Sequence, residues 1–210
     1  MHRRPFLRTG LALAAVGTAG CLGESEGPAF TEGFEDGLGE WETAAAIGPE
    51  VDLADFEWTI DVSDEQAAEG EQSLRIVNEG DHDDGTCWAV HPMSAEEGQA
   101  YTATVTAEFW SESESFNSIR DAVVRLGPEP PDTEQDFPQP QQNTTDQGET
   151  PFGGLRESLW LAEGWRTYEF EWATPELATD TLWLAVGTSV IWETTATHYV
   201  DEITVELAPR

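Results

Sequence analysis

The chain has 210 residues, of which 42 are Asp or Glu and only 9 are basic, so its formal net charge at pH 7 is −33. This excess of acid argues against nucleic-acid binding, because contacts to phosphates need clustered Lys and Arg side chains. Repulsion of this size is largely screened at molar salt, where the Debye length is about 3 Å, so the composition indicates a halophilic protein. Nine Trp and nine Phe residues exclude a disordered acidic chain and predict a folded core.

The N-terminal segment, residues 1–20, has the pattern of an export signal. The run Arg3-Arg4-Pro5-Phe6-Leu7 resembles the twin-arginine export motif, and an apolar stretch follows that is shorter than the about 20 residues needed to cross a bilayer. Thr18-Ala19-Gly20-Cys21 then resembles a lipobox, in which a peptidase cuts before the cysteine and the thiol carries lipid. The alternative is a chance basic start on a cytosolic protein. Together with the acidic composition, the segment resembles the leader of haloarchaeal exported lipoproteins.

These motifs predict how the chain is divided. We expect a signal peptide at residues 1–20, lipid on Cys21, a flexible tether over residues 21–29 and one folded domain over residues 30–210. The mature protein is then anchored through Cys21 to the outer face of the cell membrane.

The folded domain shows the periodicity of β-strands and almost no helical pattern. Apolar and polar residues alternate in Phe56–Val62, Tyr101–Phe109 and Tyr168–Trp172, which predicts strands with one buried face. Further strands are expected at Ser73–Asn78, Thr86–Val90, Ala122–Leu126, Leu182–Val190 and Tyr199–Leu207. About eight antiparallel strands separated by turn signals predict an all-β fold, a β-sandwich of jelly-roll type.

A Pro- and Gln-rich insertion, residues 127–154, interrupts the strands and has no periodicity. Loops longer than about 12 to 15 residues are usually functional or disordered, and this composition favours disorder. Asn143-Thr144-Thr145 within the insertion is a glycosylation sequon, so Asn143 is a predicted glycosylation site on an exported loop.

Residue patterns typical of catalysis or of transition-metal binding are sparse. No HExxH or GxSxG motif and no phosphate-binding glycine loop occurs, and carboxylate pairs are uninformative in so acidic a chain. His82 lies among aspartates and is more typical of a solvated turn than of a metal site. With Cys21 assigned to lipid, Cys87 has no partner for a disulfide and is expected to be a small buried residue.

The last predicted strand raises the question of a metal. Asp201 shares the parity of Tyr199, Ile203 and other apolar residues, so it is expected to face the core, where an uncompensated carboxylate is costly. Glu35 poses a similar problem beside Phe34. A hard cation between the two carboxylates would resolve both, and Ca²⁺ is preferred because its shell takes six to eight oxygens. The alternative is that Asp201 lies beside solvent at a strand end.

Several landmarks resemble the carbohydrate-binding modules of the galactose-binding-like jelly rolls. These landmarks occur in the family's order: Gly33-Phe34-Glu35-Asp36-Gly37 with Trp41, then residues 68–74, then Gly98-Gln99-Ala100-Tyr101-Thr102, then Tyr199-Val200-Asp201-Glu202-Ile203. The resemblance implies a structural Ca²⁺ held by Glu35, by groups in the Glu69 to Ser73 region and by Asp201. The insertion departs from the family's pattern, and no ligand-binding signature of the family matches residue by residue.

A sugar-binding surface needs aromatic rings on the polar face of a strand, because sugar rings present apolar C–H faces. By parity Trp110 lies outside the apolar stripe of its strand, and Trp183 shares a face with small residues; Trp88 is ambiguous. Asp121 and Arg125 have outward parity and are candidates for hydrogen bonds to a polyol. The alternative for Trp110 and Trp183 is a second buried layer or a cover formed by the insertion. The remaining tryptophans with a clear assignment are expected in the core: Trp41, Trp58 and Trp172.

Three functions remain at this stage. The first is a non-catalytic surface module that binds carbohydrate, with polysaccharide or a surface glycan as partner. The second is a structural or adhesive module that binds proteins, because the fold does not determine the function. The third, placed last, is a glycan-active enzyme.

Overall fold

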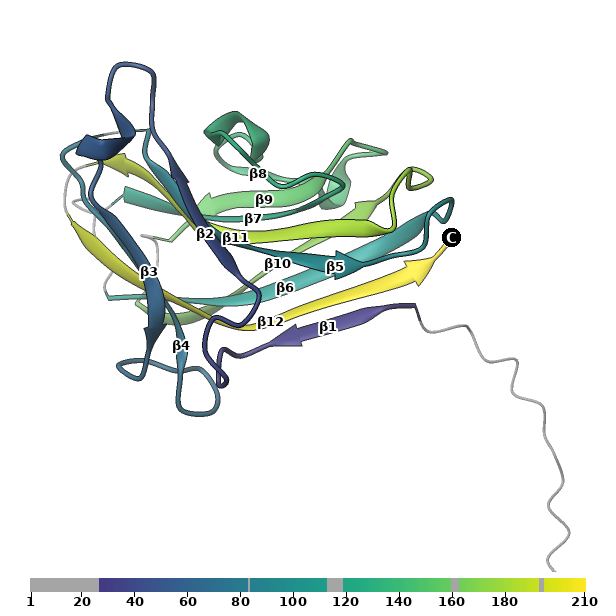
Figure 1. Cartoon of the computed structure of the whole chain (residues 1–210), viewed down its shortest axis with the longest axis horizontal. Helices are drawn as coiled ribbons and strands as arrows, with labels where there is room; N and C mark the ends of the chain where they lie inside the picture. The colour runs from purple at the N-terminus through teal and green to yellow at the C-terminus, as the bar shows by residue number, and fades with distance from the viewer. Residues whose placement is uncertain (1–26, 83, 113–118, 160–162, 193–194) are drawn as a thin grey trace, which may run out of the picture.

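The computed structural model describes residues 27–210 apart from 83, 113–118, 160–162 and 193–194 (Figure 1). The predicted signal peptide, Cys21 and most of the tether lie outside the described residues. No helix within the described ranges is long and apolar enough to cross a membrane. The helices that occur are short 3-10 turns: η1 (Leu53–Asp55), η2 (Glu134–Asp136) and η3 (Thr144–Asp146).

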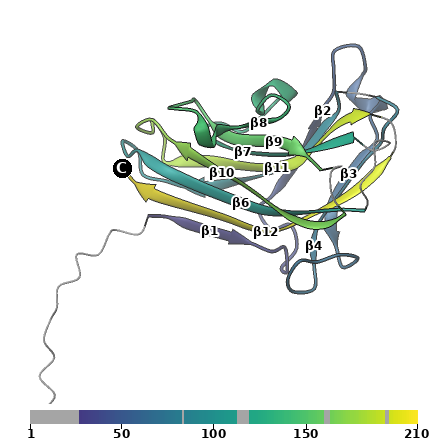
Figure 2. The same ribbon diagram turned by 180° about the vertical axis from the view of Figure 1, so that it is seen from behind.

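Two antiparallel sheets pack face to face, as the opposite views of Figures 1 and 2 show. Sheet A has the order β10 (Gly164–Ala173), β6 (Tyr101–Ser111), β12 (Ala196–Pro209), β4 (Ser73–Asn78) and β3 (Trp58–Ser63), and β1 (Ala29–Glu32) also pairs with β12. Sheet B has the order β2 (Glu42–Ala46), β5 (Thr86–Ser94), β11 (Thr181–Trp192), β7 (Ile119–Gly127), β9 (Gly153–Ser158) and β8 (Gln142–Asn143).

The predicted fold class is confirmed: the chain is an all-β antiparallel sandwich of jelly-roll type. Each of the predicted strands occurs, and the short strands β1, β2, β8 and β9 were not predicted.

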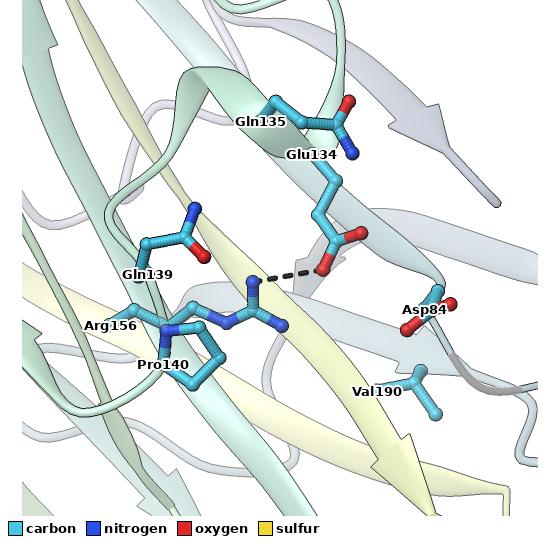
Figure 3. Close-up of a pocket in the computed structure, with 7 residues that line it drawn as sticks. All are labelled: Asp84, Glu134, Gln135, Gln139, Pro140, Arg156 and Val190. Atoms are coloured by element: carbon cyan, nitrogen blue, oxygen red, sulfur yellow. Dashed lines mark hydrogen bonds and ion pairs between the residues drawn. The ribbon is translucent and has the colours of Figure 1, made fainter.

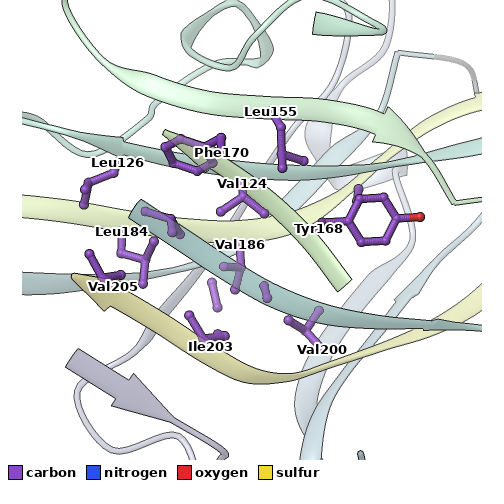
Figure 4. Packing of buried hydrophobic residues seen from close by; sticks show 14 of the residues in the cluster. Val124, Leu126, Leu155, Tyr168, Phe170, Leu184, Val186, Val200, Ile203 and Val205 are labelled. Carbon is purple, nitrogen blue, oxygen red and sulfur yellow. The ribbon is translucent and has the colours of Figure 1, made fainter. Parts of the chain in front are cut away.

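The core lies between the two sheets and follows the predicted alternation. Side chains of β6, and of β10 from Tyr168 onward, alternate between buried and accessible positions along the strand. Tyr168 and Phe170 face the aliphatic residues of sheet B (Figure 4). Trp41 and Trp172 belong to this core, whereas Trp58 is only partly buried and packs against its margin. Cys87 is free and fully buried, and this burial raises the pKa of its thiol to about 12, so it behaves as the expected small core residue.

The insertion is folded onto the outer face of sheet B, and the expectation of disorder is wrong. It contains η2, β8 and η3, and Phe137 is buried in a second apolar cluster with Trp88 and Val123. A capping box at Thr133 and Asp136 closes η2 with local hydrogen bonds. One well-placed phenyl ring and side-chain caps therefore order a segment that has little apolar content.

Candidate functional site

A row of side chains crosses five consecutive strands of sheet A on its outer face. Through the strand registers, Trp165 of β10 lies opposite Trp110 of β6, which lies opposite Tyr199 of β12. Tyr199 in turn lies opposite Arg75 of β4, and Arg75 lies opposite Asp61 of β3. Directly opposed residues point to the same side of a sheet. Each of the row's residues in β6, β12, β4 and β3 has a sequence neighbour in the core, so the row faces outward; these neighbours are Phe109, Val200, Ile76 and Ile60. We call the five opposed residues the outer row.

The aromatic half of the outer row is a supported but accessible surface. Trp110 and Trp165 are both half-buried. The ring of Tyr199 is almost fully buried and meets Trp110 edge to face, with ring centroids 5.4 Å apart and an interplanar angle of 80°. Its hydroxyl donates a hydrogen bond of 2.6 Å to Glu65 Oε2. Tyr199 therefore holds Trp110 in position while part of each indole faces solvent.

The polar half of the outer row is an ordered set of donors and acceptors. Arg75 Nε and Nη2 donate to the two oxygens of Asp61 at 2.8 and 2.7 Å, and this hydrogen-bonded pair raises the pKa of Arg75. Arg75 also lies 3.9 Å from Glu65, and both line a hollow of about 340 Å³ together with Gln72. Burial, and after it the hydrogen bond to Glu65, raises the pKa of Tyr199 to about 12, so the hydroxyl stays a donor.

The outer row has the chemistry that sugar rings require. Indole rings accept the apolar C–H face of a pyranose, while carboxylate, amide and guanidinium groups exchange hydrogen bonds with its hydroxyls. The outward position predicted for Trp110 agrees with the structure. Trp165 and Tyr199 were missed, and the signal that could have found them is the pairing of β10, β6 and β12, which strand periodicity does not supply.

The other predicted ligand residues lie on the outer face of sheet B. The outward parity predicted for Trp183, Asp121 and Arg125 agrees with the register, and Trp88, whose face was left open, lies on the same face. The predicted contact with solvent is wrong for Trp88, Asp121 and Arg125, which are buried. Trp88 meets Phe137 at 5.2 Å with the rings edge to face, and Trp183 packs against the same cluster. The alternative of a covered second layer therefore describes this face.

The buried polar residues of that face tie the insertion to the sheet. Arg156 of β9 pairs with Asp121 at 3.3 Å and with Glu134 of the insertion at 2.9 Å, and burial raises the pKa of Asp121 to about 6 although Arg156 opposes the shift. Arg125 donates to the carbonyl of Glu129 and lies over the ring of Phe152, 4.8 Å from its centroid. Burial lowers the pKa of Arg125 to about 10. These contacts stabilise the insertion.

Asp201 lies elsewhere than its parity predicts, because β12 contains an irregularity. The register with β6 shifts between Asp201 and Thr204, so Tyr199 and Asp201 lie on the outer face while Ile203 points into the core. Asp201 is nevertheless fully buried, because the chain at residues 68–69 covers it. Its Oδ2 accepts hydrogen bonds from the backbone N–H groups of Ala68 at 2.8 Å and Glu69 at 3.3 Å.

Glu35 lies in the same region and is held by the same loop. Its Oε1 accepts hydrogen bonds from the backbone N–H groups of Glu71 and Gln72 at 2.8 and 2.9 Å. Gly70 has a φ of +67°, and a Cβ there would lie 2.2 Å from Glu35 Oε1, so the loop needs glycine at this position. Backbone N–H groups thus supply much of the compensation that a cation was predicted to supply.

The region remains strongly negative. Burial raises the pKa of Asp201 although backbone N–H groups oppose it, and the nearby Glu35 raises it further. The pKa of Glu202 is raised by burial and then by the surrounding carboxylates of Asp201, Glu69, Glu108 and Glu35. No three His, Cys, Asp or Glu side chains in the described part of the chain are arranged to hold a metal ion. The donors suit a hard cation in chemistry and charge, and Ca²⁺ at Glu35, Glu69 and Asp201 stays a prediction.

Asn143 has a structural role that competes with glycosylation. Its Nδ2 donates to Glu157 Oε1 and to the carbonyl of Glu169, both at 2.8 Å, and its Oδ1 accepts from Thr145. Attachment of a glycan to this nitrogen would replace one of its hydrogens. Glycosylation of Asn143 remains a prediction.

Comparison with solved structures finds this fold at low sequence identity. A carbohydrate-binding module of the β-sandwich superfamily, described for its promiscuous specificity, matches with a TM-score of 0.51 and 17% identity, over 81% of this chain and 59% of that chain. The N-terminal tandem of CBM22 modules from Paenibacillus barcinonensis matches with a TM-score of 0.51 and 13% identity, over 91% of this chain and 48% of that chain. An adhesin domain of Lys-gingipain from Porphyromonas gingivalis matches with a TM-score of 0.50 and 13% identity, over 88% of this chain and 99% of that chain.

The likeness is one of fold. The chain spans 59% and 48% of the length of the two carbohydrate-binding structures. No protein-family model matches the sequence, and no curated protein matches it either. The chain therefore has the β-sandwich fold of carbohydrate-binding modules.

Proposed function

We propose that this protein is a non-catalytic module that binds a polysaccharide or surface glycan on the outer row of sheet A. The observation that carries the proposal is the outer row itself, in which two accessible indoles continue into a fixed arginine–carboxylate pair on one face of the sheet. The fold shared with carbohydrate-binding modules supports it. The test is affinity electrophoresis of the protein in molar KCl through gels that contain a panel of polysaccharides. Retardation by a glycan is the expected result.

A second candidate is adhesion to a protein partner. The same fold occurs in an adhesin domain, and this likeness favours the candidate. It predicts that no glycan retards the protein and that a protein partner is recovered by the immobilised module, with recovery lost when the outer row is altered. Turnover of a glycan that disappears with one carboxylate replaced would instead indicate an enzyme.

The proposal includes export and lipid anchorage in a halophile, supported by the leader and by the net charge of −33. In a haloarchaeal host the wild-type protein is expected in the membrane fraction and to be released by detergent. Cys21→Ser is expected to move it to the soluble fraction or the medium, because two or more lipid chains hold a protein at a membrane and a bare tether does not. Cys87→Ala, which removes the buried thiol, is the matched control and should stay with the membrane. Equal partitioning of all three proteins would contradict the anchor.

We also propose a structural Ca²⁺ beside Asp201, supported by the negative region around Glu35, Glu69 and Glu202. At constant ionic strength in KCl, chelation of Ca²⁺ is expected to lower the melting temperature by about 5 to 10 °C. The reason is that a ligand present at about 100 times its Kd stabilises the folded state by about 2.7 kcal/mol. Asp201→Asn should melt at the same temperature with and without Ca²⁺. Glu97→Gln changes an exposed carboxylate that is distant in sequence from the proposed ligands, so the melting temperature of this variant should still depend on Ca²⁺. An unchanged melting temperature of the wild type after chelation contradicts the calcium proposal.

A further inference from the structure

A cavity of about 330 Å³ lies between the insertion and the outer face of sheet B (Figure 3). Its lining combines Glu134, Gln135 and Gln139 of the insertion with Arg156 of β9 and with Asp84. The cavity belongs to sheet B and is separate from the outer row, which lies on the opposite sheet. Its volume is at the lower end of the range for small-molecule sites, which suits a single sugar ring and not an extended chain.

Arg156 forms a fixed wall of this cavity. The residue is 5% exposed, and each of its guanidinium nitrogens has a partner. Nε lies 3.3 Å from Asp121 Oδ2, Nη2 donates to Ser189 Oγ at 2.7 Å, and Nη1 donates to Glu134 Oε1 at 2.9 Å, the contact that Figure 3 marks. Both Asp121 and Glu134 are carboxylates, so the positive charge of Arg156 is neutralised within the protein.

The network behind the wall is not fully satisfied. Asp121 is completely buried, and its Oδ1 has no hydrogen-bond partner. A buried acceptor in this state is destabilising, because it has lost its hydrogen bonds to water and gained none in the protein. Asp121 does not itself line the cavity, and it acts on the site only by helping to hold Arg156 in place.

The charge of the residues that line the cavity disfavours anions. An anion would meet the carboxylates of Asp84 and Glu134, while Arg156 is already neutralised, so anionic ligands are disfavoured. The two amides, Gln135 and Gln139, both donate and accept hydrogen bonds without charge. Pro140 and Val190 complete the lining with apolar contacts. Uncharged hydroxyl groups on a compact carbon skeleton match this mixture.

We propose that this cavity is a second binding site, which takes a neutral monosaccharide or a polyol of similar size. The carboxylate of Glu134 and the amides of Gln135 and Gln139 hold the hydroxyls, and Pro140 contacts the carbon skeleton. This second site differs from the outer row because it recognises a single small ring beside the insertion and not an extended chain on sheet A. It does not depend on glycan binding at sheet A.

The experiment uses the full chain in molar KCl and measures binding of glucose, galactose, mannose, xylose and glycerol by saturation-transfer NMR and calorimetry. At least one of these probes is expected to bind with a Kd of about 1 mM, which corresponds to about −4.1 kcal/mol. The double variant Gln135→Ala/Gln139→Ala is expected to weaken this binding at least about tenfold, and its two sites are exposed, so the fold should be retained. Gln147→Ala, an exposed glutamine of the same insertion, is the matched control and should bind normally.

A Trp110→Ala variant separates this site from the outer row. It is expected to bind the monosaccharide with unchanged affinity even if it loses a polysaccharide. Absence of binding by every probe overturns the second site, and so does binding that Trp110→Ala removes and the double glutamine variant preserves. A third outcome would also overturn the sugar site: no sugar binds, but Mg²⁺ or Ca²⁺ binds and the double variant weakens that binding. This outcome would indicate a cation site at Asp84 and Glu134.

Discussion

Trp110→Ala is expected to reduce the affinity for the retarding glycan by about thirtyfold or more. Tryptophans at the centre of binding surfaces typically contribute 2 kcal/mol or more, and 1.4 kcal/mol corresponds to a factor of ten. Trp110 lies at the centre of the aromatic half of the outer row, between Trp165 and Tyr199 in register. Affinity electrophoresis and calorimetry in molar KCl measure the loss.

Three further variants show that the loss reflects binding and not misfolding. Trp110→Phe keeps an aromatic ring and should restore part of the affinity. Arg75→Lys keeps the charge but loses the paired hydrogen bonds to Asp61, so it should weaken binding less than Trp110→Ala does. Trp183→Ala alters the covered face of sheet B and should leave the affinity unchanged. If Trp183→Ala abolishes binding while Trp110→Ala does not, the outer row is not the glycan site.

Phe137→Ala is expected to lower the free energy of unfolding by about 3 to 5 kcal/mol, the usual cost of removing a buried phenyl ring. The side chain is 1% exposed and packs edge to face on Trp88, so its removal leaves a cavity in the small cluster between the insertion and sheet B. For a domain of this size each kcal/mol shifts the melting temperature by about 2 to 4 °C. Urea unfolding at a fixed KCl concentration gives the free energy.

Phe152→Ala is the matched control for Phe137→Ala. Phe152 is only partly buried and its ring lies under the guanidinium of Arg125, so the loss of this ring is expected to cost about 1 kcal/mol. Limited proteolysis should cut the insertion of Phe137→Ala faster than that of the wild type or of Phe152→Ala. A change below about 1 kcal/mol for Phe137→Ala would mean that the insertion does not take part in cooperative folding.

The strands that could be predicted are those with one face toward the core and one toward solvent. In β6, and in β10 from Tyr168 to Trp172, burial alternates strictly along the strand, and the amino-acid pattern reports this directly. β9 lacks the signal because it is covered on both faces, by the core on one side and by the insertion on the other. Its first residue, Gly153, lies so close to Trp172 that a Cβ on Gly153 would be 2.3 Å from the Cβ of Trp172. Such a strand has no alternation to detect.

The candidate site could be predicted only in part. Trp110 was found because it breaks the apolar pattern of its own strand, but a binding row is a property of several paired strands. The register shift in β12 reverses the parity of Tyr199 and Asp201, and a single inserted residue of this kind leaves no periodic signal. Asp121 and Arg125 have the parity that was predicted, and Trp88, whose face was left open, lies on the same face, yet all three are buried.

The sequence by itself determined the all-β class, the two-faced strands, the acidic character and the expectation of export with lipid on Cys21, because these depend on composition and on patterns within one segment. Only the tertiary structure decided which tryptophans are accessible, how Asp201 is compensated and that residues 127–154 form a folded cover. Those properties depend on contacts between segments far apart in the chain, such as Phe137 with Trp88 and Trp110 with Tyr199. Whether a side chain is exposed depends on which other segment packs against it, and the sequence of one strand does not specify that segment.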